Sequence, residues 1–105
     1  MRKKNGADLY IIQMAVTGDI KVGRSKDVHR RLRQLQTGSP HPLRLILHIP
    51  DGGHLERRFH NLMRQRRTTH RGEWFEVGAL SELPVEAYEG LDLETQDWWC
   101  EPPYV

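Results

Sequence analysis

Four polar side chains stand beside apolar residues in this sequence, and their types suit chemistry on a phosphodiester: Tyr10, Lys21, Arg31 and Glu56. A guanidinium can offer a bidentate fork to a phosphate, and a carboxylate is a hard ligand suited to Mg²⁺ or Mn²⁺. A phenol, with an unperturbed pKa of about 10, is a poor base at neutral pH unless a nearby cation lowers that pKa. Phosphodiester hydrolysis needs an in-line nucleophile, stabilised phosphoryl oxygens and help for the leaving oxygen.

The first elements that must position these groups form a predicted hairpin. Residues 7–14 alternate as a strand does, and after a turn signal residues 20–22 read as the returning strand. Successive side chains of a strand point to opposite faces. Ile20 and Val22 therefore face together, and Lys21 must face away from them.

A helix is predicted over residues 27–36, and either Ser25 or Asp27 can cap it. Arg31 lies closest to its apolar stripe, three residues after the first member of that stripe and four before the last. We therefore expect Arg31 to be the most sheltered arginine of this helix. The stripe comprises Val28, Leu32 and Leu35.

The remaining pattern predicts a third strand over residues 43–49 and a second helix over 53–67. Glu56 and His60 fall on one flank of that helix, and residues 73–77 are expected to form a last short strand or edge segment. Together these elements predict an α+β fold, in which a small three-stranded antiparallel sheet is flanked by helices in the order β-β-α-β-α. In the third strand alternation places one set of side chains on one face: Leu43, Leu45, Leu47 and Ile49.

The ordered motifs resemble a known nuclease superfamily. DLY, then KVG, an arginine in the next helix and a glutamate in a later helix are similar to the GIY-YIG endonucleases. The closest resemblance is to the T5orf172 or Mug113-like branch, in which the second motif typically reads K-[IV]-G. RSKDVHRRLRQLQTGSP, LERRFH and GEWFEV also resemble that branch, and the resemblance covers about residues 8–77.

The resemblance implies a role for each of these residues. Tyr10 would activate or position the attacking water, and Lys21 occupies the position of the second catalytic tyrosine. Arg31 would bind the scissile phosphate, and Glu56 would hold a single Mg²⁺ or Mn²⁺. His60, one turn beyond Glu56, would carry a proton, contact the phosphate, or make a structural hydrogen bond to Glu56. Whether Tyr10 or Lys21 removes the proton from water stays open.

Charge is segregated along the chain. Residues 21–71 carry thirteen Lys and Arg against three acids, whereas residues 72–105 carry nine acids and no Lys or Arg. A basic block of this density is typical of proteins that bind polyanions, although solvated helix faces and helix C-termini also attract basic residues. We expect DNA as the partner and the following residues as its contacts: Arg24, Lys26, Arg30, Arg33, Arg57, Arg64 and Arg67.

The sequence divides into an expected nuclease-like domain, residues 1–77, and an acidic C-terminal extension, residues 78–105, with aromatic side chains. We expect this extension to pack on the domain or on a partner chain. A single cysteine, no signal peptide and no apolar run of membrane-spanning length favour a cytoplasmic protein with no membrane partner. No organic cofactor is expected, and the spacing of the histidines around Glu56 does not suit zinc.

The predicted function is a divalent-metal-dependent endonuclease that hydrolyses DNA with low sequence specificity. The alternative is a non-catalytic DNA-binding module of the same fold. It is favoured by the small size of the chain and by Leu35, at a position where many superfamily members carry His or Tyr. A third class is an interaction domain in which the acidic extension of one chain covers the basic face of another. We expect specificity to come from a homodimer, a partner or DNA shape.

Overall fold

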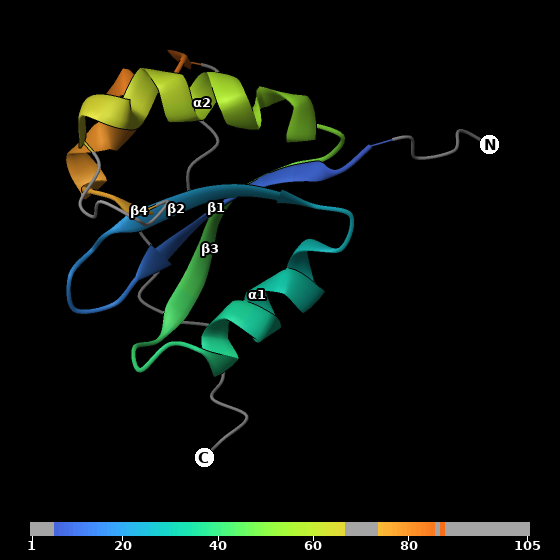
Figure 1. The fold of residues 1–105 in the computed structure, drawn as a ribbon, viewed down its shortest axis with the longest axis vertical. Helices are drawn as coiled ribbons and strands as arrows, with labels where there is room; N and C mark the ends of the chain where they lie inside the picture. The colour runs from blue at the N-terminus through green and yellow to red at the C-terminus, as the bar shows by residue number, and fades with distance from the viewer. Residues whose placement is uncertain (1–5, 67–73, 86, 88–105) are drawn as a thin grey trace.

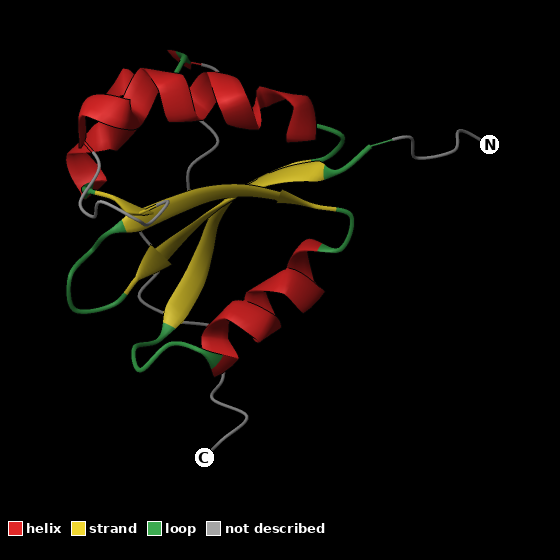
Figure 2. Ribbon diagram, viewed as in Figure 1, coloured by secondary structure: helices red, strands yellow, loops and turns green. Residues whose placement is uncertain are grey.

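The computed structural model describes residues 6–66, 74–85 and 87 as an α+β domain (Figures 1 and 2). No helix in these ranges has the length and apolar character needed to cross a membrane. Short 3-10 segments, η1, η2 and η3, adjoin the second helix and the last strand. The elements are β1 Asp8–Met14, β2 Ile20–Ser25, α1 Val28–Thr37, β3 Leu43–Ile49, η1 Gly53–Leu55, α2 Glu56–Met63, η2 Arg64–Arg66, β4 Trp74–Phe75 and η3 Val77–Glu82.

The sheet has four antiparallel strands in the order β3-β1-β2-β4, so the prediction of three strands was wrong. The added strand is β4, in which Phe75 lies opposite Ile20 and Trp74 opposite Lys21. It falls within residues 73–77, which we expected to form a last short strand or edge segment, but two residues are too few to show by alternation that this segment joins the sheet. The short strand sends one aromatic side chain to each face of the sheet.

Each face of the sheet is covered by one helix, α1 on one side and α2 on the other (Figure 1). The α1 side holds a small cluster of buried residues, against which Leu35 and Trp74 pack. The α2 side holds the larger core, which includes Ile20, Val22 and Phe59. The buried residues of the α1 side are Tyr10, Ile12, Val28, Leu32 and Leu43.

A bulge in β3 changes which of its side chains face each helix. Ile11 lies opposite Leu47 and Ile12 opposite Leu45, so Ile46 is an extra residue between them. Ile46 and Leu47 both pack in the α2-side core. The prediction of one continuous face was therefore wrong, since the bulge divides the predicted set between the two sides of the sheet.

Residues beyond Val77 contribute to the core. Ala79, Leu80, Leu83 and Ala87 pack with the α2-side cluster. The rest of the expected acidic extension, residues 88–105, lies outside the described residues, and the domain boundary at 77 stays a prediction.

An ion pair ties β4 to the chain after α2. Arg66 donates to Glu76 at 2.7 Å, and the backbone N–H of Glu76 donates to the carbonyl of Arg66 at 2.9 Å. The side-chain hydrogen bond to Glu76, and then the charge of that carboxylate, raise the pKa of Arg66 above its ordinary value. The pair is exposed, so its main effect is to fix the approach of β4 to the sheet.

A buried glutamine on α1 holds the loop that leads into β3. The side chain of Gln36 donates to the carbonyl of His41 at 2.9 Å and accepts from the backbone N–H of Leu43 at 2.7 Å. Gln36 is fully buried. Its amide therefore satisfies one donor and one acceptor of the backbone where α1 passes into the sheet.

Replacing this amide should destabilise the protein. We expect Gln36→Ala to lower the free energy of unfolding by about 2–4 kcal/mol, because two buried backbone groups lose their partners. Urea denaturation measures the change. Gln34→Ala, on the exposed side of the same helix, is the matched control and should have little effect. Equal stability of the two variants would contradict this assignment.

Candidate functional site

The phenol of Tyr10 lies across the backbone of Gly23. The two residues are partners in the β1–β2 register, and a Cβ atom at position 23 would overlap the phenol oxygen and the ring carbon that bears it. Tyr10 is only 3% exposed. The ring of the tyrosine in the DLY motif thus packs against the glycine of the KVG motif, where a larger residue would not fit.

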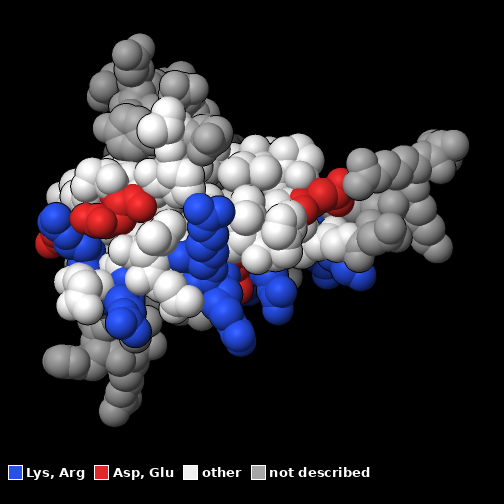
Figure 3. Space-filling view, turned by 90° about the horizontal axis from the view of Figure 1, so that it is seen from above, with Lys and Arg blue, Asp and Glu red and all other residues white. Residues whose placement is uncertain are grey.

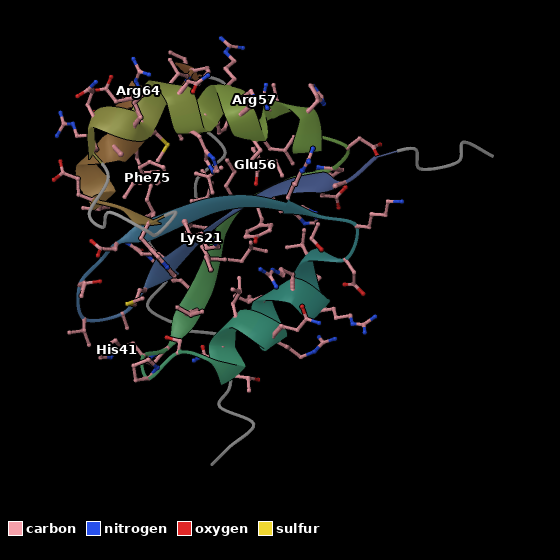
Figure 4. All side chains as sticks on the ribbon, in the orientation of Figure 1. Lys21, His41, Glu56, Arg57, Arg64 and Phe75 are labelled. Carbon is pink, nitrogen blue, oxygen red and sulfur yellow. The ribbon has the colours of Figure 1, made fainter. Side chains whose placement is uncertain are left out.

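Lys21 faces away from Ile20 and Val22, as predicted, and it extends from the same face of the sheet as Tyr10. Ile20 and Val22 pack in the core on the α2 side, whereas Lys21 lies on the α1 side of β2 (Figure 4). Lys21 is 8% exposed and stands between Ile12 of β1 and Trp74 of β4. A lysine side chain with so little exposure is unusual on a short strand.

Arg31 is exposed, so the prediction that it would be sheltered was wrong. The buried stripe of α1 runs through Val28, Leu32 and Gln36, not through Leu35. At about 100° per residue, this shift turns the buried face away from Arg31 by about 40°. Arg31 Nη1 donates to Gln34 Oε1 at 3.5 Å, and the guanidinium stands on the flank of the helix that faces solvent.

Asp27 is the residue that caps α1. Its carboxylate accepts the backbone N–H of Arg30 at 3.1 Å, while Ser25 Oγ accepts the N–H of Asp27. The alternative left open by the sequence is therefore resolved in favour of Asp27. This cap sets the direction in which α1 leaves β2, and with it the position of Arg31.

Glu56 begins α2 on the opposite side of β2 from Lys21 (Figure 4). Its carboxylate lies 3.7 Å from Nε of Arg24, and the Glu56 side chain is 25% exposed. A close backbone approach fixes this start of the helix, since the N–H of Gly53 donates to the carbonyl of Ala7 at 2.8 Å and a Cβ at position 53 would overlap that carbonyl.

His60 fastens α2 to the edge of β2. Its Nε2 lies 2.7 Å from the carbonyl oxygen of Val22, and a carbonyl can only accept, so Nε2 carries the proton. In the neutral ring Nδ1 is then the acceptor. The hydrogen bond predicted from His60 to Glu56 goes to the backbone of the KVG motif instead.

The predicted residues thus form two groups. Tyr10, Lys21 and Arg31 belong to the α1 side of the sheet, and Glu56 and His60 belong to the α2 side. The two groups lie on opposite faces of the sheet, and in the part of the chain that the structure describes β4 pairs with β2 only at Ile20 and Lys21, so no described strand pairs with this edge of β2 over residues 22–25. A phosphate that touches both groups must lie at this edge.

The expected DNA contacts are exposed wherever the structure describes them. Figure 3 shows Lys and Arg side chains gathered along one side of the face seen from above α2. Arg57 also lines an open groove on α2 together with His54, Arg58 and Asn61. Arg67 lies outside the described residues. The exposed members are Arg24, Lys26, Arg30, Arg33, Arg57 and Arg64.

The sequence did not reveal a second polar cluster, on the other flank of α1. Asp8 Oδ2 lies 2.7 Å from His48 Nε2, and Asp8 Oδ1 accepts the backbone N–H of Asp51 at 2.8 Å. The ring of His29 stands edge-on to His48 at 6.2 Å. The bulge in β3 brings His48 to this face, and no alternation in the sequence predicts a bulge. The described residues contain no group of three or more metal-ligating side chains suited to a metal ion.

Comparison with known proteins identifies the family of this chain. The T5orf172 domain matches residues 9–91, which is most of the sequence. The chain belongs to the T5orf172 domain family. No curated protein and no solved structure matches it.

The T5orf172 domain falls in the GIY-YIG-like, nuclease-associated group, which suggests a nuclease-like or DNA-binding function. The matched range begins inside the DLY motif, at Leu9, and it contains the KVG motif and all five residues proposed for catalysis. It also contains the core residues after Val77.

The contact between Tyr10 and Gly23 can be tested by a double-mutant cycle. Gly23→Ala should destabilise the protein by about 1–3 kcal/mol, because the new methyl group displaces the phenol. In a Tyr10→Ala background the same substitution should cost much less, since the ring is gone. Urea denaturation of the four proteins gives the coupling free energy. An equal cost of Gly23→Ala in both backgrounds would show that the ring does not lie on this glycine.

Proposed function

We propose that this protein is a divalent-metal-dependent endonuclease that hydrolyses DNA phosphodiester bonds with low sequence specificity. The observation that carries the proposal is the phenol of Tyr10 lying across Gly23, on the same face as the buried Lys21, in a member of a nuclease-associated family. A lysine with so little exposure, on the same face of the sheet as a phenol, is uncommon in a small domain. In the proposed reaction this arrangement would help to remove the proton of the attacking water.

In the proposed reaction a water oxygen attacks the phosphorus, one P–O ester bond breaks, and the leaving oxygen takes a proton from solvent. The proton of the attacking water passes to Tyr10 or to Lys21. An ammonium at Lys21 favours the phenolate of Tyr10, and Lys21 without its proton would itself accept one. Arg31 would hold the non-bridging oxygens by a bidentate pair of hydrogen bonds.

Glu56 is the residue that would hold the metal ion. It is a partly buried carboxylate, 25% exposed, at the start of α2, with Arg24 of β2 as its neighbour at 3.7 Å. A single carboxylate fits Mg²⁺ or Mn²⁺, because these ions commonly keep several waters and share the substrate phosphate. When bound, the ion supplies Lewis-acid stabilisation of the developing charge. Arg24 would have to move away from Glu56 to admit the ion, or turn toward the phosphate. We therefore expect substrate and metal to bind together.

The exposed basic residues on both helices would hold the DNA backbone. Contacts of Lys and Arg with phosphates release counterions, so the affinity should fall steeply with salt and depend weakly on sequence. The chain supplies these contacts from α1, from β2 and from α2. Arg30 and Arg33 lie on α1, Arg24 lies on β2 and Arg57 lies on α2, while Arg64 follows α2 as the first residue of η2.

A non-catalytic DNA-binding module is the second candidate, favoured by one observation. Tyr10 is only 3% exposed, so little of the phenol is open to a water or a substrate. Such a module would bind DNA with the same salt dependence but would not cleave it, whichever metal ion is added. Binding and cleavage measured on the same preparation distinguish the two candidates.

The metal ligand can be tested with a conservative variant. We expect Glu56→Gln to reduce the rate of plasmid nicking in Mg²⁺ or Mn²⁺ by roughly a hundredfold or more, because the amide has no charge for the ion. Glu82→Gln, an exposed carboxylate paired weakly with Arg66, is the matched control and should cleave at the wild-type rate. Chelation of divalent ions should abolish cleavage by every protein. Nicking by Glu56→Gln at the wild-type rate would place the metal site elsewhere.

The buried amine can be tested separately. Lys21→Met keeps the length of the side chain and removes its charge, and we expect single-turnover cleavage at neutral pH to slow by roughly a hundredfold. Lys21→Arg keeps a positive charge and does not release a proton at neutral pH. Recovery of cleavage in Lys21→Arg would assign Lys21 an electrostatic role, and loss in both variants would assign it the proton transfer. Full activity of Lys21→Met would return Lys21 to a structural role.

A further inference from the structure

A small hollow lies on the α1 side of the sheet, between the C-terminal half of α1 and β4. Its volume is about 290 Å³. The indole of Trp74 and the side chains of Leu35 and Met14 give it apolar walls, and Gln34 and Ser39 bring polar groups to it. The hollow is smaller than the sites that usually hold a drug-sized molecule, so it suits a single ring system.

This hollow adjoins two residues of the proposed site, Lys21 and Arg31. Trp74 is the direct cross-strand partner of Lys21, which places the two side chains on the same face about 5 Å apart at their Cα atoms. Gln34, at the other side of the hollow, accepts the hydrogen bond of Arg31. Two of the residues that line the hollow, Trp74 and Gln34, thus have a lysine and an arginine as their neighbours.

This combination matches the chemistry of a nucleotide. A nucleobase stacks on an indole through its π-face, whatever its sequence, and the adjoining phosphate is attracted to Lys and Arg. A base that is paired and stacked within a duplex cannot reach a hollow behind Trp74, whereas the base of an unpaired nucleotide can. The amide of Gln34 could hydrogen-bond the edge of such a base.

We propose that the Trp74 hollow receives the base of an unpaired nucleotide next to the bound phosphate, so that the substrate class is DNA with unpaired nucleotides at the site of cleavage. This inference rests on the proposed function, because it takes DNA as the partner. It goes beyond that function by assigning the protein to substrates with a single-stranded segment. Trp74 is in this account a specificity-determining residue.

The first test uses the wild-type protein and changes only the DNA. Affinity is measured by fluorescence anisotropy with divalent ions chelated, so that no cleavage occurs. The probes are a single-stranded oligonucleotide, the matching duplex, and single strands in which one abasic nucleotide is moved along the sequence. We expect tighter binding to the single strand and a loss of roughly tenfold for an abasic nucleotide at the position that faces Trp74. Equal affinity at every abasic position would overturn the inference.

The second test uses paired variants of the indole. Trp74→Leu should lose roughly tenfold in affinity for the single strand and little for the duplex, whereas Trp74→Phe keeps an aromatic face and most of the affinity. Urea denaturation shows whether each variant is folded. If Trp74→Leu does not fold, the abasic probes still test the inference, because they use the wild-type protein. Equal losses for both DNA forms would assign Trp74 to the core alone.

These measurements separate the two proposals. Failure of the wild type to bind any DNA would overturn the proposed function and this inference with it. Cleavage of DNA together with equal affinity for all probes would overturn only the inference.

Discussion

The packing of one phenol against one glycine constrains the geometry of this site. Tyr10 needs the space above position 23, and that space exists only while β1 and β2 keep their register. The hairpin fixes the register from its other end, where the N–H of Met14 donates to the carbonyl of Asp19 and the amide of Gln13 donates to the carbonyl of Gly18. A slip of one residue would send Tyr10 to the opposite face. The sheet therefore places a phenol on the α1 side as a consequence of ordinary hairpin geometry.

The sheet also separates the chemistry into two halves. The phenol and the amine lie under α1, while the carboxylate and His60 belong to α2. The contact that joins them is the hydrogen bond from His60 to the carbonyl of Val22, which attaches α2 to the strand between Lys21 and Gly23. A movement of α2 relative to β2 would therefore also move Lys21 and Gly23. A substrate at the edge of β2 would complete the site, and a metal ion on Glu56 would be held partly by that substrate.

Sequence reasoning predicted the features that depend on regular periodicity. The first three strands, the α+β order and the outward turn of Lys21 from Ile20 and Val22 follow from local patterns, which also narrowed the cap of α1 to Ser25 or Asp27. It failed where tertiary packing overrides the pattern. Gln36 is buried because the backbone needs its amide, and this change of the buried stripe leaves Arg31 exposed. The bulge at Ile46 and the two-residue β4 have no periodic signal, so the placement of His48 and the hollow beside Trp74 could only come from the structure.

The central claim is that the hydroxyl of Tyr10, held over Gly23, takes part in hydrolysis. Tyr10→Phe keeps the ring and its packing and removes one oxygen atom, so single-turnover cleavage of DNA by this variant is the most direct measurement. The account predicts unchanged DNA affinity and unfolding, with a cleavage rate lower by roughly a hundredfold or more. Cleavage at the wild-type rate would contradict it and would leave the phenol as a core residue that only fixes the register of the hairpin.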